Sequence, residues 1–148
     1  MLALAFSSTI VSAQGMASYG AFLSSLDNAS REHLDALVGD VQTTVFVSNG
    51  VMTVGGEGSA RVLDFSVADY SSVVWNSSLL TQVELVRVRV NNSNELASVL
   101  DMTGSSSLSQ LRYVVVLSAV EASHAQLGNV LNGTGSSVQL LYEISIPN

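Results

Sequence analysis

The chain contains no cysteine and no lysine, and its one proline is Pro147. Without cysteine there can be no disulfide framework, no thiol nucleophile and no thiolate metal site. Without lysine there can be no phosphate loop of the Walker type, which requires that residue. The basic residues are five arginines, and the net charge is −7. We therefore expect neither nucleic acid nor an anionic membrane surface as a partner, because both are bound through basic patches.

Charged residues of both signs are scarce. They make up 11% of the 148 residues, whereas apolar residues make up 47%. This balance predicts a folded chain with a substantial core, because disorder needs low hydrophobicity and high charge. The length is typical of a single domain. No segment approaches the ~20 consecutive apolar residues of a membrane-spanning helix, so we expect no membrane span.

The first thirteen residues are similar to the end of an export signal. A short apolar segment begins at Leu2, and Val11 and Ala13 stand at the −3 and −1 positions of a signal-peptidase site. We predict that residues 1–13 are a signal-peptide remnant and that residues 14–148 form one exported domain, which is periplasmic, cell-surface or extracellular. The alternative is a buried strand or helix at this end of the chain.

One helix is predicted over residues 27–39. Asp27, Asn28 and Ser30 are candidate N-cap residues, the apolar positions that follow recur at helical spacing, and Gly39 stands where a helix commonly ends.

From residue 40 onward the chain is rich in valine and repeats itself. The segment 80–88 aligns without a gap with 108–116, at an offset of 28 residues, and the shorter segments 62–66 and 99–103 echo each other. The pattern of the first copy is Leu80-x-x-Val83-x-x-Val86-x-Val88-x-x-Asn91. Weaker copies begin at Val38 and Val138, and the segment 51–58 interrupts the repeat as an insertion, for which an extra hairpin is one explanation.

This pattern resembles the leucine-rich repeat, whose consensus has leucines at the same spacing, an asparagine at the end and a period of 20–29 residues. The resemblance covers about two thirds of the chain and is most specific for the copy at 80–91. It implies a leucine-rich-repeat-like secreted bacterial protein with divergent, valine-rich repeats. In that family the asparagine, here Asn49 and Asn91, bonds to backbone at the turn that follows each strand.

The copies also predict strands without reference to any family. β-branched residues alternate in each copy, and strands 28 residues apart cannot form tight hairpins, so parallel stacking is expected. Val86, Val88, Val114 and Val116 should then face the core. The fold class that follows is a β-rich, leucine-rich-repeat-like solenoid, with about four parallel strands and a capping helix at the N-terminal end. The alternative is an antiparallel β-sandwich.

Catalytic chemistry has little support in the sequence. His33 and His124 lie in no nucleophile motif, and both are expected at the surface. Asp64 and Asp101 occupy equivalent positions in the two echoes, and we assign them a repeated structural role as acceptors of backbone N–H groups in turns. We expect no metal and no cofactor. A hydrolase whose serine, histidine and acid come from distant positions stays an open, less favoured alternative.

The favoured function is therefore non-catalytic binding of a protein or glycan partner through the strand face opposite the core. Val45 and Val47 are assigned to this face together with the candidate binding residues. The candidate binding residues are Leu85, Arg87, Arg89, Tyr113, Val115, Leu117 and Tyr142. Two alternatives stay open: a helix or connection covers this face and makes it a second core, or the chain is a structural subunit that forms homo-oligomers through the edge of its C-terminal strand.

Overall fold

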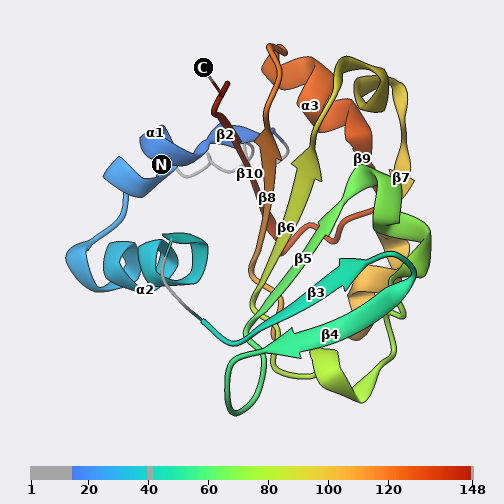
Figure 1. The fold of residues 1–148 in the computed structure, drawn as a ribbon. Coiled ribbons are helices and arrows are strands. Elements are labelled where there is room, and N and C mark those ends of the chain that lie inside the picture. Colours follow the sequence, from blue (N-terminus) through green and yellow to red (C-terminus); the bar gives the residue numbers. More distant parts are fainter. Residues whose placement is uncertain (1–14, 40–41, 148) are drawn as a thin grey trace.

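The computed structural model describes residues 15–39 and 42–147, so the predicted signal-peptide remnant lies outside the described residues. Seven strands form one mixed sheet (Figure 1). The central five lie side by side and parallel in the order β3 (Thr44–Ser48), β5 (Val62–Ser66), β6 (Leu85–Val90), β8 (Tyr113–Ser118) and β10 (Gln139–Ile144). At one edge β4 (Val51–Gly55) pairs antiparallel with β3, and at the other β2 (Ala17–Ser18) pairs in parallel with β10.

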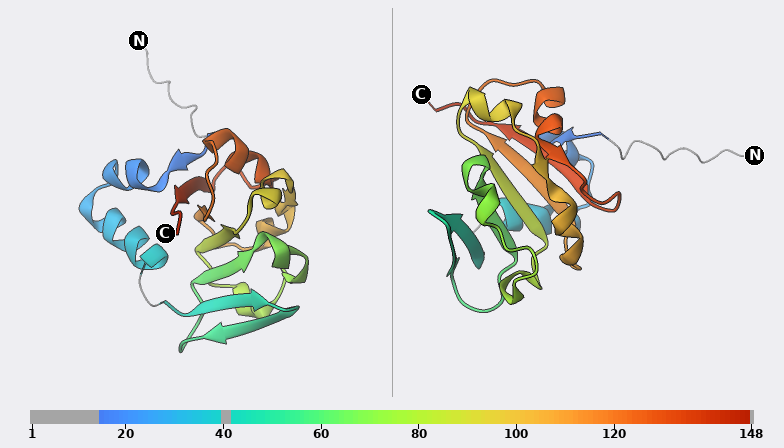
Figure 2. Two further views of the ribbon diagram at one scale, coloured as in Figure 1. Left: turned by 45° about the horizontal axis from the view of Figure 1, so that its top comes forward. Right: turned by 90° about the vertical axis from the view of Figure 1, so that its right-hand side faces the viewer.

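Helical segments cover both faces of the sheet (Figures 1 and 2). The first face carries α1 (Tyr19–Ser24) and α2 (Asn28–Gly39). The second carries α3 (His124–Val130) and the 3-10 segments η2 (Val67–Ser72), η3 (Ser78–Leu80), η4 (Ser93–Ala97) and η5 (Met102–Ser107). On this side β7 (Leu100–Asp101) and β9 (Leu131–Asn132) form a separate two-stranded sheet.

The expected solenoid is wrong. The main sheet is mixed and has seven strands, where the repeat predicted about four parallel strands. The predicted capping helix lies on a face of the sheet, where Leu34 and Leu37 pack against the sheet residue Leu85. The alternative sandwich is wrong too, because helices and 3-10 segments cover the large sheet, and the second sheet has only two strands.

The predictions of individual strands and of the helix were more accurate than the predicted architecture. β6 and β8 are parallel neighbours, and Leu85 pairs with Tyr113 at the predicted offset of 28. The alternation is also confirmed, since Val86, Val88, Val114 and Val116 all belong to the core on the α3 side. The predicted helix over 27–39 is α2, and Asp27 Oδ1 accepts a hydrogen bond of 2.8 Å from the Ser30 N–H in its first turn.

The insertion at 51–58 contains β4, which forms a hairpin with β3. The turn is Asn49–Gly50, and both residues have positive φ, at 53° and 80°. A two-residue turn of this kind matches the twist of the flanking strands, and Asn-Gly is its most favourable sequence. Asn49 is therefore a turn residue, not a member of a repeated asparagine row, and Asn-Gly between two apolar runs was the signal for this hairpin.

Candidate functional site

The face that carries α1 and α2 divides into a covered half and an open half. Leu85, Tyr113 and Val115 lie in the covered half, where each is less than 9% exposed and packs under the two helices. These three candidate binding residues thus form part of a second core. Burial of aliphatic side chains here holds α1 and α2 to the sheet and keeps these residues out of reach of a partner.

Arg87 and Arg89 point from β6 toward one carboxylate, that of Asp64 on β5. The strand register places Asp64 directly beside Arg87. Arg89 donates two hydrogen bonds of 2.8 Å, one from Nε to Oδ1 and one from Nη2 to Oδ2. Arg87 Nε lies 2.9 Å from Oδ2, although its N–H is not aligned as a hydrogen bond. Asp64 is only 4% exposed, so one buried carboxylate serves two arginines.

The two arginines differ in their surroundings. Burial lowers the pKa of Arg87, and the neighbouring Asp64 carboxylate opposes that shift. Hydrogen bonds to Asp64 raise the pKa of Arg89, whose side chain is 45% exposed. Arg87 Nη1 also donates to the Val38 carbonyl at 3.0 Å, which ties the end of α2 to the middle of the sheet. Arg87 is therefore mainly structural, whereas Arg89 keeps an exposed flank.

Asp64 and Asp101 do not share a structural role, so the predicted equivalence is wrong. Asp101 is exposed, and its Oδ1 accepts hydrogen bonds from the Thr103 N–H at 3.1 Å and hydroxyl at 2.7 Å. This is the turn role predicted for both residues. Asp64 instead lies inside the sheet and neutralises arginines.

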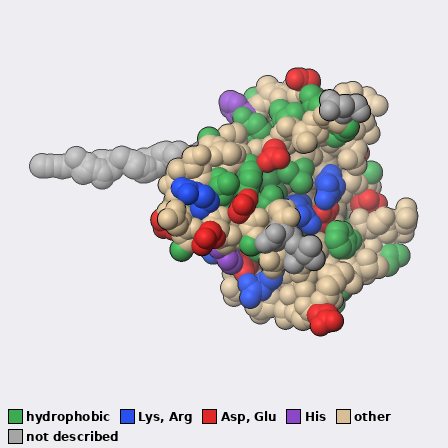
Figure 3. Space-filling view, turned by 60° about the vertical axis from the view of Figure 1, so that its left-hand side comes forward, with side chains coloured by type: hydrophobic (Ala, Val, Ile, Leu, Met, Phe, Trp, Pro, Cys, Tyr) green, Lys and Arg blue, Asp and Glu red, His purple; other side chains and the backbone are tan. Residues whose placement is uncertain are grey.

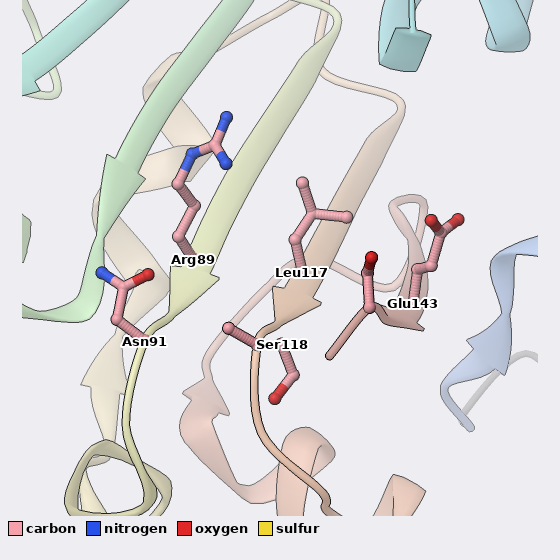
Figure 4. Close-up of a pocket in the computed structure, with 7 residues that line it drawn as sticks. Arg89, Asn91, Leu117, Ser118 and Glu143 are labelled. Carbon is pink, nitrogen blue, oxygen red and sulfur yellow. The ribbon is translucent and has the colours of Figure 1, made fainter. Parts of the chain in front are cut away.

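The open half of the face forms a hollow at the carboxyl ends of three strands (Figure 4). Its volume is about 330 Å³. Its lining residues come from or directly follow β6, β8 and β10: Arg89, Asn91, Leu117, Ser118, Ala119, Glu143 and Ser145. The register aligns Arg89, Leu117 and Glu143 in one row across the strands. An apolar side chain thus lies between a cationic and an anionic one.

Figure 3 shows the molecule with the α1 and α2 side brought forward. Hydrophobic side chains gather in the middle of this view, and charged side chains of both signs surround them. Solvent-facing sheet surfaces are normally polar, and apolar groups with a polar rim are typical of contact sites.

Tyr142, Val45 and Val47 lie on the other face, so their assignment to the candidate binding face is wrong. Tyr142 pairs with Val116, and its ring stacks on His124 with centroids 6.3 Å apart. Val45 and Val47 are buried in the core on the α3 side. Apolar residues adjoin Tyr142 and these valines along their strands, so the alternation of apolar and polar residues does not show which face each side chain takes. The sequence therefore assigned them to the wrong face.

A second charged cluster lies at the amino ends of the strands. Glu84 immediately precedes β6, and its carboxylate accepts from His33 Nε2 at 2.8 Å and pairs with Arg61 Nη1, while Arg112 Nη1 lies 3.8 Å away. Burial raises the pKa of Glu84, but His33 and Arg61 outweigh that effect and hold it below the usual 4.5. The repeat pattern contained no sign of this cluster, because its members come from four separate segments.

The histidines occupy unrelated positions. His33 pairs with Glu84, and exposed His124 stacks on Tyr142. Within residues 15–39 and 42–147, no serine hydroxyl hydrogen-bonds to either ring, and no three acidic or histidine side chains form a group that could hold a metal. A helix long and apolar enough to cross a bilayer is not found among the residues that the structure describes.

Comparisons with known proteins found nothing similar. No protein-family model matches the chain, no curated protein matches its sequence, and no solved structure matches its fold. None of the comparisons identifies a leucine-rich-repeat protein, so that resemblance rests on the sequence pattern alone, and the solenoid it implied is not the fold observed.

Proposed function

We propose that this chain is an exported, non-catalytic binding module that engages its partner through the hollow at the carboxyl ends of β6, β8 and β10. The observation that carries the proposal is the open half of the sheet face, where Arg89, Leu117 and Glu143 lie in one row and no described helix covers them. Two of the candidate binding residues, Arg89 and Leu117, line this hollow.

A peptide segment of a protein partner suits the hollow better than a glycan. Leu117 and Ala119 supply an aliphatic floor, and Arg89 and Glu143 offer a donor and an acceptor of opposite charge on its two sides. β6 and β10 are separated by β8 alone, so these charges arise from backbones about 10 Å apart, two strand spacings. A peptide carries apolar groups and both kinds of charge over such a length, whereas a neutral glycan would bring no opposite charge to either Arg89 or Glu143.

A non-catalytic role fits the arrangement of the titratable groups. The carboxylate that meets His33, Glu84, also meets Arg61, and the carboxylate beside the hollow, Asp64, is held by two arginines. A dispersed hydrolase site would need a serine, a histidine and an acid in contact. The hollow is lined by serines but contains neither histidine.

The binding proposal is tested by presenting the purified chain with a displayed library of random peptides and with a panel of neutral oligosaccharides. We expect peptides to be selected. Glu143→Lys, which reverses one of the two charges, should weaken their Kd at least about tenfold, equivalent to about 1.4 kcal/mol. Glu32→Lys is the matched control, since Glu32 is exposed on α2 away from the hollow, and it should leave Kd unchanged.

Two results would count against this site. Selected peptides that bind Glu143→Lys and Arg89→Gln as tightly as the unaltered chain would place binding elsewhere. Selection of oligosaccharides with no peptide would replace the proposed ligand class. Export is tested separately by mass spectrometry of protein recovered outside the cytoplasm, which should begin at Gln14. Retention of residues 1–13 there would contradict the signal-peptide assignment.

The alternative of self-assembly through the C-terminal strand receives less support. β10 is not the outermost strand, because β2 pairs with it at Leu141 and Tyr142. The opposite edge of the sheet offers a better surface for assembly.

A further inference from the structure

The β4 edge of the sheet lacks the usual protection. No described strand pairs with the outer side of β4, and its sequence, Val51-Met52-Thr53-Val54-Gly55, contains no charge and no proline. Natural edge strands are commonly protected by lysine, proline, a bulge or very short length. The strand at the opposite edge, β2, has only two residues, so its short length protects that edge, whereas β4 has no such protection.

Exposed apolar side chains gather at the same edge. The described residues include seven large hydrophobic side chains with high exposure, and five of them, each 41–55% exposed, lie on β4 or beside it: Phe46, Val51, Val54, Val74 and Leu79. The Phe46 ring lies over Gly55, and the Val74 N–H lies 3.3 Å from the Met52 sulfur. Val54 and Leu79 line one hollow of about 320 Å³. Such concentration of apolar surface is typical of a contact site.

The hairpin register determines which backbone groups face outward. The Asn49–Gly50 turn joins Ser48 to Val51, and in a two-residue hairpin that first pair is hydrogen-bonded. Alternate pairs are therefore hydrogen-bonded, which directs the N–H and C=O groups of Thr53 toward Phe46. The N–H and C=O groups of Met52 and Val54 consequently point away from β3 and are free to pair with another strand.

We propose that β4 pairs antiparallel with β4 of a second copy of this chain, about a twofold axis at Thr53. Met52 then faces Val54 of the second copy, and the two residues exchange both backbone hydrogen bonds, which gives four bonds across the axis. Thr53 faces Thr53 of the second copy as a pair without mutual hydrogen bonds. The edge is thus complementary to itself in this register.

Charge is compatible with this dimer although each chain carries −7. No charged residue occurs between Thr44 and Gly56. The first one after the strand, Glu57, would lie opposite Asn49 of the second copy, so no like charges face each other at the junction.

The test uses the complete chain and measures molecular mass by sedimentation over a wide range of concentration. The unaltered chain should dimerise reversibly. Thr53→Lys and Thr53→Glu should each weaken the dimer at least about tenfold, since two like charges would oppose each other at the axis. An equimolar mixture of the two variants should recover a dimer, because opposite charges then meet. Asn129→Lys, on the exposed side of α3, adds the same charge and should leave the dimer unchanged.

A second readout uses the absence of cysteine. Thr53→Cys should form a disulfide-linked dimer on mild oxidation, whereas Asn129→Cys should form no disulfide-linked dimer. A monomer at every concentration would overturn the proposal. So would a dimer that persists in Thr53→Lys, or a mixture of the lysine and glutamate variants that fails to reassociate. Unchanged circular dichroism in both charge variants establishes that loss of the dimer is not loss of the fold.

Discussion

The two buried carboxylates of the sheet, Asp64 and Glu84, hold arginines in different ways. Asp64 lies within β5, and the register of β5 and β6 brings Arg87 and Arg89 to it. Glu84 lies just outside β6, and long side chains from other segments reach it from solvent. The Arg87 side chain is 13% exposed, whereas Arg61 is 47% exposed. Similar ion pairs therefore differ in the solvent exposure of the arginine side chains that form them.

We expect burial of the partners, more than the number of contacts, to determine how much the fold depends on each charge. A cation without its counterion is costly only if water cannot replace the lost contacts. Arg87 cannot be rehydrated without opening the junction between α2 and the sheet, because it also donates to the Val38 carbonyl. Arg61 and His33 need only rotate into solvent.

The largest expected effect is that of Asp64→Ala. Removing this carboxylate leaves Arg87 buried and unneutralised, so the free energy of unfolding should fall by about 3–5 kcal/mol. Urea denaturation measures the change. Asp101→Ala is the control from the equivalent sequence position, where the carboxylate caps an exposed turn, and it should lower the free energy of unfolding clearly less than Asp64→Ala does. Equal losses in the two variants would refute the contrast.

Glu84→Ala should have a smaller effect, about 1–3 kcal/mol. Its partners His33, Arg61 and Arg112 are 41–53% exposed and recover hydration when the carboxylate is removed. Urea denaturation measures this loss of unfolding free energy as well, and the loss should be smaller than that of Asp64→Ala. A loss as large as that of Asp64→Ala would show that exposure of the partners does not decide the cost.

The pH dependence of stability sharpens the role of Glu84 further. Because its pKa is lowered in the folded chain, its contribution is complete above the usual value of 4.5 and is lost as the pH falls through the lowered pKa. The difference in unfolding free energy between the unaltered chain and Glu84→Gln should therefore shrink as the pH falls from 4.5 through the lowered pKa. Chemical denaturation at a series of pH values measures this difference. A difference that grows on acidification would contradict the assignment.

The smallest effect is expected from Arg112→Ala. Its guanidinium lies 3.8 Å from Glu84 and 5.3 Å from the centre of the Tyr113 ring, and its side chain is 53% exposed. Exposed ion pairs and cation–π contacts each contribute about 0.5–1 kcal/mol or less, so the thermal midpoint should change little. A marked fall in that midpoint would mean that the cluster acts as a tightly coupled unit.

The sequence by itself determined the local features of this protein. Alternation of β-branched residues predicted β6 and β8, their parallel pairing and the faces of Val86 and Val114, because successive side chains of a strand point to opposite sides. Helical spacing after Asp27 predicted α2. The insertion at 51–58, for which a hairpin was one explanation, does form one at Asn49–Gly50. The capping box of Ser123 with Gln126 is a local signal for α3, which the repeat pattern did not predict.

Only the tertiary structure decided where these elements meet. The return of α2 across the sheet makes Leu85 and Tyr113 core residues, and the hollow exists because α1 and α2 leave the carboxyl ends of the strands open. The partners of Asp64 and Glu84 come from separate segments, and a pattern along the chain contains no distances across space. Local periodicity follows from backbone geometry, whereas the open face, the charge clusters and the β4 edge depend on the path of the connections.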